Sequence, residues 1–201
     1  MKPFLPRLCR IFLLLSLALL SACASLPPPA VYDFGLPAAR LAGDGKWAKI
    51  RLEVISPPWS DTLGISYRLS YDDPLKVRKY TGSRWAGFPG VLLAQRLQQQ
   101  LGSTSASANT RSYCSVRIEL QEFSQHFESP QTSWGVLQAQ VFLINARRER
   151  LAEYAVSIKK PAATADAPGG VNALLDAGSE LGQQLADWLT RQEEKLPACP
   201  L

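Results

Sequence analysis

Short stretches of alternating apolar and polar residues in this chain predict β-strands with one buried face. The clearest case is 49–56, where the apolar residues Ile50, Leu52 and Val54 are separated by charged ones. Pro57-Pro58 follows and ends the strand, because proline has no amide hydrogen to donate to a neighbouring strand.

Six other segments have a strand-like composition or alternation. They are 31–36, 64–70, 75–80, 116–121, 137–143 and 154–158. Turn-forming residues at 72–74 and 145–150 predict that the segments flanking each turn pair as hairpins.

Apolar residues at a spacing of three and four predict two helices. One face of the first carries four leucines, at Leu92, Leu93, Leu97 and Leu101, and Gly102 follows as a stop signal. The second helix is expected over 171–189, with its apolar stripe packed against the sheet. Between the periodic segments, 103–112 and 161–170 are rich in small, polar and turn-forming residues and are expected to be loops.

Strands before and after the first helix suggest one βαβ crossover, and the later hairpin adds antiparallel strands. The predicted fold class is therefore α/β, a single domain with a mixed β-sheet and two packed helices.

The N-terminus has the features of a secretory signal: basic Lys2, Arg7 and Arg10, then a ten-residue apolar run over 11–20. Such a run is too short to cross a bilayer, which needs about 20 apolar residues. Leu20-Ser21-Ala22-Cys23 closes it and resembles the bacterial lipoprotein signal, in which the cysteine thiol is lipidated. An ordinary signal peptide cut elsewhere is the alternative.

The predicted organisation is a removed signal peptide at 1–22, a lipidated Pro-rich tether at 23–30, and one domain at 31–201. Bacterial lipoproteins with Asp just after the cysteine tend to stay in the inner membrane, whereas here Ala24 and Ser25 follow. We therefore expect the protein to be lipid-anchored to the outer membrane, facing the periplasm.

The formal net charge of +5 does not indicate a nucleic-acid partner. Three of the 22 basic residues leave with the signal and none of the 17 acidic ones do, so the mature chain is near +2. That small excess is spread along the sequence and leaves no basic patch for DNA or RNA.

The cysteines suggest a disulfide. Cys9 lies in the signal and Cys23 in the lipidation motif, which leaves Cys114 and Cys199. In an oxidising periplasm this pair is a disulfide candidate, worth roughly 4 to 5 kcal/mol in the chain-entropy model. Two unpaired thiols are the alternative. No metal site is expected, because neither cysteine has a paired ligand spacing and His126 is the one histidine of the sequence.

Several landmarks occur in an order that resembles the ABC-type transport auxiliary lipoprotein family, which includes the lipoprotein of the Pqi intermembrane transport system. The matching pieces are Tyr32-Asp33-Phe34-Gly35-Leu36, Leu52-Glu53-Val54-Ile55-Ser56-Pro57-Pro58-Trp59, Ile65-Ser66-Tyr67-Arg68, Trp85-Ala86 with Pro89, and the closing helix ending in Asp187-Trp188-Leu189. Gly87-Phe88 departs from the family, which more often has an acidic residue before the proline.

The resemblance implies an α/β domain that works beside a transporter containing mammalian-cell-entry domains, which moves lipids between the two membranes. It also implies no enzymatic activity. The residue types of the chain are consistent with this expectation, since any histidine-based catalytic triad would depend on His126 alone. For His126, a solvated or loop-capping position is the simpler interpretation. No cofactor is expected.

Aromatic residues among turn residues mark the candidate partner-binding positions, which are Trp59, Trp85 and Phe88. The alternative is that the tryptophans fold back to cover the ends of the sheet. Two functions stay open: an auxiliary lipoprotein that docks a lipid transporter at the outer membrane, or a structural lipoprotein of envelope assembly. A third possibility, lipid carried in a cavity of the domain itself, cannot be read from alternation patterns.

Overall fold

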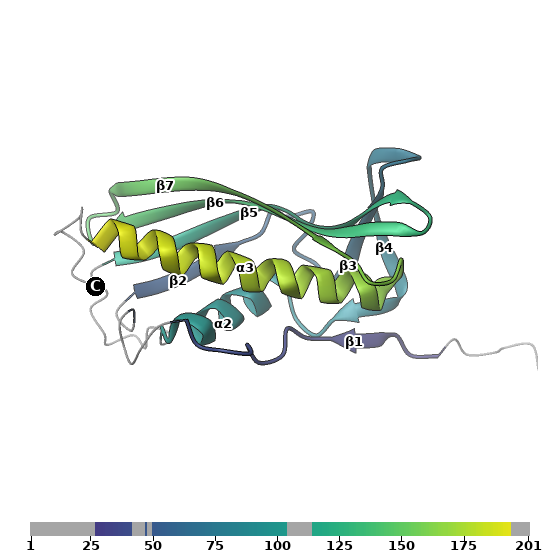
Figure 1. The fold of residues 1–201 in the computed structure, drawn as a ribbon, viewed down its shortest axis with the longest axis horizontal. Coiled ribbons are helices and arrows are strands. Elements are labelled where there is room, and N and C mark those ends of the chain that lie inside the picture. Colours follow the sequence, from purple (N-terminus) through teal and green to yellow (C-terminus); the bar gives the residue numbers. More distant parts are fainter. Residues whose placement is uncertain (1–26, 42–46, 48–49, 104–113, 194–201) are drawn as a thin grey trace, which may run out of the picture.

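A seven-stranded mixed sheet with two helices on one face forms the body of the protein (Figure 1). The structure, a computed structural model, describes residues 27–41, 47, 50–103 and 114–193. In chain order the elements are β1 (Ala30–Tyr32), β2 (Ile50–Ile55), β3 (Gly64–Leu69), β4 (Asp73–Trp85), α2 (Pro89–Leu101), β5 (Cys114–Ser129), β6 (Thr132–Asn145), β7 (Arg150–Pro161) and α3 (Ala167–Glu193). The predicted α/β fold, a single domain with a mixed sheet and two packed helices, is confirmed.

The long strand β5 organises the sheet. On one side it pairs antiparallel with β6, which pairs with β7. On its other edge two strands lie end to end: β2 pairs in parallel from Cys114 to Glu119, and β3 pairs in parallel from Gln125 to Phe127. The chain leaves this edge after β2 because Pro57-Pro58 cannot continue a ladder.

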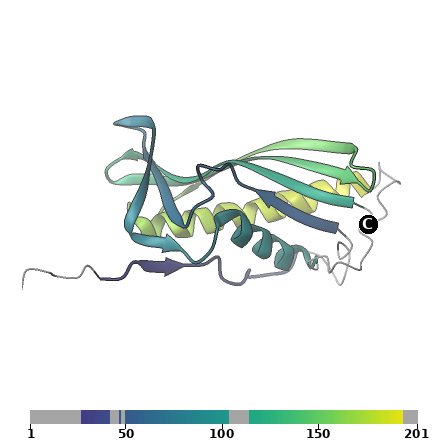
Figure 2. The same cartoon turned by 180° about the vertical axis from the view of Figure 1, so that it is seen from behind.

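The parallel partners of β5 are thus β2 and β3, whereas the strand directly before α2 is β4, which is separated from β5 by β3. Strand β4 runs antiparallel to β3, and the short β1 adds in parallel at Ser83 to Trp85 (Figure 2). The predicted crossover is present, but it includes the β3–β4 hairpin as well as α2.

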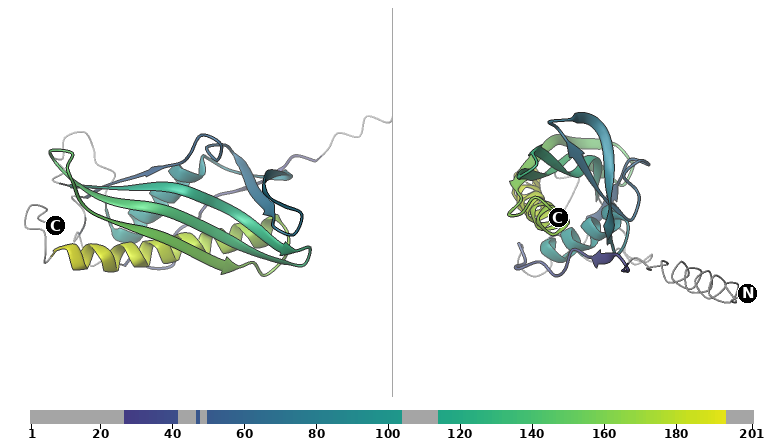
Figure 3. Two further views of the ribbon diagram at one scale, coloured as in Figure 1. Left: turned by 90° about the horizontal axis from the view of Figure 1, so that it is seen from above. Right: turned by 90° about the vertical axis from the view of Figure 1, so that its right-hand side faces the viewer.

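Both helices lie inside the curve of the sheet, as the view along the molecule shows (Figure 3). Helix α3 packs across β5, β6 and β7, and α2 packs against β2 and α3. Gly178 and Gly182 allow the helices to approach closely, since a Cβ atom on Gly182 would lie 2.3 Å from Gln100 Oε1. Gly102 ends α2 in the left-handed conformation, as predicted.

The predicted alternation agrees with the burial of β2, where Ile50 and Leu52 are buried while Arg51 and Glu53 are exposed. The prediction of a loop over 161–170 is wrong for its last four residues, because α3 begins at Ala167. The Asp166 carboxylate accepts a hydrogen bond from the Gly169 amide at 2.9 Å and so caps the helix.

Three aromatic rings form the part of the core that joins β1, β4 and β5. The ring centroid of Phe34 lies 5.1 Å from that of Trp85 and 5.7 Å from that of Phe123. Trp85 is only 1% exposed. These contacts hold the N-terminal segment of the domain onto the sheet.

Replacing Trp85 with alanine is expected to lower the free energy of unfolding by about 3–5 kcal/mol, the usual cost of removing a large buried aromatic side chain. Trp59→Ala is the matched control, because this ring is 40% exposed and should contribute about 1 kcal/mol. Urea unfolding of both variants measures the difference. Equal losses would contradict the burial described here.

Candidate functional site

The three predicted partner-binding residues lie in different surroundings. Of the three candidate positions, Trp85 is not accessible to a partner, because its side chain points inward at the end of β4 and packs on Phe34 and Phe123. It follows the alternative, in which a tryptophan covers the end of the sheet. Trp59 and Phe88 are 40% and 47% exposed, so both are accessible to a partner.

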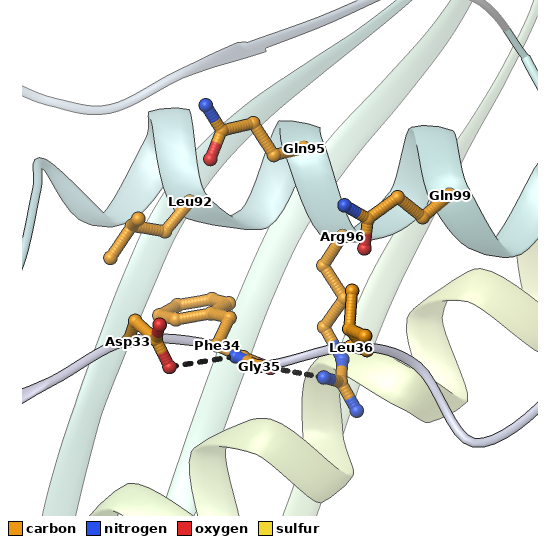
Figure 4. A pocket seen from close by; sticks show the side chains of 8 residues that line it. All are labelled: Asp33, Phe34, Gly35, Leu36, Leu92, Gln95, Arg96 and Gln99. Carbon is orange, nitrogen blue, oxygen red and sulfur yellow. Dashed lines mark hydrogen bonds between the residues drawn. The ribbon is translucent and has the colours of Figure 1, made fainter.

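A groove runs between helix α2 and the chain segment that follows β1 (Figure 4). Its volume is about 240 Å³. The lining residues are Asp33, Phe34, Gly35, Leu36, Leu92, Gln95, Arg96 and Gln99. The segment continues along the helix to its end, where the Leu41 amide donates to the Gln100 carbonyl at 2.7 Å.

Local backbone geometry shapes one wall of the groove. The Gly35 amide donates to Asp33 Oδ1 at 3.0 Å, and Gly35 has a φ of +53°, a conformation that glycine adopts without steric cost. The turn places the Phe34 ring in the core, while Leu36 remains 82% exposed. The sequence Asp33-Phe34-Gly35-Leu36 thus encodes one anchored residue and one exposed apolar residue.

Arg96 joins three segments at the base of this groove. Its guanidinium donates to the carbonyl of Phe34 and to Ser179 Oγ of α3, the latter at 3.0 Å. Burial lowers the pKa of Arg96, and the negative charge of Asp176 opposes that shift. The arginine therefore acts as a positioning residue that ties the N-terminal segment to both helices.

Exposed apolar side chains occur on β1, on the segment after it that lines the groove, and at the start of α2. We call this set the α2 surface; its members are Val31, Leu36, Phe88 and Val91. Of these four residues, only Phe88 was predicted from the sequence. The exposure of Val91 could also have been predicted, because it lies two positions before the buried Leu93 and so falls outside the buried leucine face of the helix.

Trp59 belongs to a second cluster, on the face of the sheet away from the helices. The Arg68 guanidinium lies 5.4 Å from the centre of the Trp59 ring and pairs with Glu122 at 2.9 Å. Ser124 also donates to Glu122 at 2.6 Å. Burial opposes ionisation of Glu122, but His126, Ser124 and Arg68 together hold its pKa below the ordinary value.

His126 lies within β5, with its Nε2 atom 3.9 Å from Glu122 Oε1. This places the imidazole beside an ion pair, in a strand and not in a loop. Within residues 27–41, 47, 50–103 and 114–193, no group of three or more His, Cys, Asp and Glu side chains is arranged to hold a metal ion.

The cysteine predictions concern the ends of the chain. Cys114 is buried as the first residue of β5. Its predicted partner Cys199 and the predicted lipidation site Cys23 lie outside the described residues, so the disulfide and the lipid anchor stay predictions. No helix in the described part of the chain is both long enough and apolar enough to span a membrane.

Comparison with known proteins assigns the family. The family described as "ABC-type transport auxiliary lipoprotein component" matches residues 57–186, which include Trp59, Phe88, all of α2, most of α3 and most of the sheet. The chain belongs to this family. The Asp33-Phe34-Gly35-Leu36 wall of the groove precedes the matched region. No curated protein is significantly similar to this chain.

Two crystal structures share the fold of this family member. A protein from Xanthomonas campestris, assigned to the family model DUF330, superposes with a TM-score of 0.69 at 15% identity, over 83% of this chain and 98% of its own. A second, uncharacterized protein has a TM-score of 0.62 at 11% identity, over 81% and 99%. At these identities the similarity establishes the fold.

Glu122→Gln tests the cluster beside Trp59. Because the folded pKa of Glu122 is depressed, its ionised form stabilises the fold above the ordinary value of 4.5, and this contribution is lost as pH falls through the folded pKa. At pH 7 the variant should be less stable by about 1–2 kcal/mol, after discounting for solvent screening. Urea unfolding between pH 3 and about 7 should show the two stabilities converging in acid; parallel curves would rule out this role.

Proposed function

We propose that this chain is a non-enzymatic auxiliary lipoprotein of an ABC-type lipid transporter that contains mammalian-cell-entry domains, and that it docks the transporter at the outer membrane. The family match carries this proposal. The N-terminal signal and the exposed α2 surface support it from independent parts of the chain.

The anchor is the lipidated Cys23. One acyl chain holds a protein only marginally, whereas a diacylglycerol plus an amide-linked chain anchors it stably. The Pro-rich residues before β1 then act as a short, stiff tether that keeps the domain close to the membrane. Ala24 and Ser25 after the cysteine favour export to the outer membrane, with the domain in the periplasm.

The α2 surface is the proposed contact with the transporter. Its exposed apolar side chains lie on β1, on the segment after it and at the start of α2. The Ala86 amide joins the chain just before α2 to β1, since it donates to the Tyr32 carbonyl. Exposed apolar residues on neighbouring segments mark binding sites. Arg96 holds the backbone next to Leu36 in place, because its guanidinium donates to the Phe34 carbonyl and to Ser179 Oγ. A preformed surface loses less conformational entropy on binding.

A non-enzymatic role fits the chemistry of the described residues. The most buried ion pair among them, Arg68–Glu122, is satisfied by its own hydrogen bonds. The groove contains Arg96, but both of its terminal nitrogens donate to the protein itself. Neither site presents an activated nucleophile beside a base.

Cys23→Ser tests the anchor. The wild-type protein should be labelled by palmitate in growing cells and should sediment with outer membranes, because the thioether carries the lipid. The variant should carry no label and should lose its outer-membrane location. An unlabelled wild-type protein would overturn the anchor.

Phe88→Ala tests the docking surface. A central aromatic residue of an interface contributes about 1.4 kcal/mol or more, so recovery of the mammalian-cell-entry component with the affinity-tagged lipoprotein should fall about tenfold. Ile55→Ala is the matched control, since Ile55 at the end of β2 is also an exposed apolar residue, at 40%, but belongs to neither the α2 surface nor the hairpin. Unfolding midpoints of both variants should match the wild type.

Mass spectrometry of the partners crosslinked in intact cells distinguishes the two functions left open by the sequence. Trapping of a permease, ATPase or mammalian-cell-entry protein supports the transporter role. Trapping of outer-membrane assembly subunits alone would support a structural lipoprotein of the envelope instead.

A further inference from the structure

The turn between β3 and β4 stands away from the body of the molecule (Figures 1 and 2), and it carries exposed apolar side chains. Leu75 is 86% exposed, and Tyr71 and Val77 beside it are also exposed. We call residues 71–77 the hairpin tip. Nothing in the described structure covers these side chains, so their exposure requires an explanation outside the domain.

The backbone of the hairpin tip is held in place by side chains. Arg68 Nη1 donates to the carbonyls of Pro74 and Leu75, each at 3.2 Å, and Asp73 Oδ1 accepts the Leu75 amide at 3.0 Å. The register between β3 and β4 jumps here, from Tyr67↔Arg78 to Leu69↔Asp73, so residues 74–77 bulge out of the ladder. The exposed leucine is therefore presented on an ordered segment.

Arg68 is itself fixed from the other side. It pairs with Glu122 at 2.9 Å and its guanidinium lies 5.4 Å from the centre of the Trp59 ring. Side chains from β3, β5 and the loop after β2 thus act together on the tip. These contacts explain the backbone conformation of Leu75, whereas its side chain is 86% exposed.

Hydrogen bonding favours a lipid surface over a protein strand as the occupant of the tip. A strand that paired with the tip would need free amide and carbonyl groups, but both backbone groups of Leu75 already have partners in the protein. An apolar medium has the opposite requirement, because every backbone group that enters it must be satisfied internally. Leu75 meets that requirement.

The charges at the tip also suit a membrane with anionic headgroups. Asp72 is paired with Arg78 at 2.5 Å, and Asp73 accepts the Leu75 amide. The Lys76 and Lys79 side chains are exposed beside the apolar tip. Lysine side chains can reach the headgroup layer while neighbouring apolar residues sit deeper.

The tether leads to the same end of the molecule. Strand β1 begins at Ala30 and lies at the end of the molecule opposite the last turn of α3, which is also the end that carries the hairpin (Figures 1 and 2). It pairs with Ser83–Trp85, at the other end of β4 from the tip, so β1 and the tip lie on opposite edges of this end. Six residues lie between Cys23 and Ala30, and the seven steps along the chain limit the distance between the two residues to about 25 Å. A lipid on Cys23 therefore brings this end of the domain toward the bilayer.

We propose that the hairpin tip is a second membrane contact, in which Leu75, with Tyr71 and Val77, enters the interfacial layer of the bilayer that holds the lipidated Cys23. This inference rests on the proposed lipid anchor. Two contacts, the lipid on residue 23 and the hairpin tip around residue 75, orient the domain on the membrane. The α2 surface stays available to the transporter.

A photoreactive amino acid placed at position 75 of the full-length lipoprotein tests the contact in intact cells. We expect covalent phospholipid adducts at position 75 at least about tenfold above those at position 138, because Gln138 is exposed on the middle of β6, away from the tip. Leu75→Asp, combined with the probe at position 77, should reduce the lipid adduct several-fold. Leu75 makes few contacts, so resistance to proteolysis should be unchanged.

Palmitate labelling of the same cells separates the two proposals. A labelled, membrane-bound protein whose position 75 yields protein adducts, or no adducts, overturns the hairpin contact while leaving the anchor intact. An unlabelled protein in the soluble fraction overturns both. Equal lipid adducts at positions 75 and 138 would also overturn the contact, since they would show no orientation.

Discussion

The positions of α2 and of the Arg68–Glu122 pair both depend on strand β5, because two separate strands, β2 and β3, pair with one of its edges. Strand β2 pairs with the first part of that edge and β3 with the last part. The chain between them leaves the sheet at Pro57-Pro58, because proline has no amide hydrogen for the ladder. This arrangement places α2 beneath β2 and brings Arg68 of β3 next to Glu122 of β5. A single continuous strand along β5 could not produce both.

The two exposed apolar regions are built in the same way. In each, an arginine from a neighbouring element donates to backbone carbonyls of the exposed segment: Arg96 to Phe34 below the α2 surface, and Arg68 to Pro74 and Leu75 at the hairpin tip. The guanidinium suits this role because it offers several donors in a rigid plane. Apolar side chains thus remain exposed on an ordered backbone, which is what a binding surface requires.

Much of the fold could be predicted from local patterns. The alternation in β2 and the leucine spacing of α2 follow directly from burial of one face, and Gly102 ends α2 where expected. The beginning of α3 could not be predicted in this way, because Gly169 and Gly170 have low helix propensity. They are required there by close packing, since a Cβ on Gly170 would lie 2.0 Å from the buried Gln125.

The sequence by itself determined what depends on neighbouring residues: the strand and helix periods, and the family to which the ordered motifs belong. The tertiary structure alone decided which aromatic residues are accessible. Trp59 and Trp85 both stand beside turn residues, yet one lies over Arg68 and the other is enclosed by Phe34 and Phe123. Their exposure depends on residues far away in the chain, and local sequence does not encode which of those residues come together.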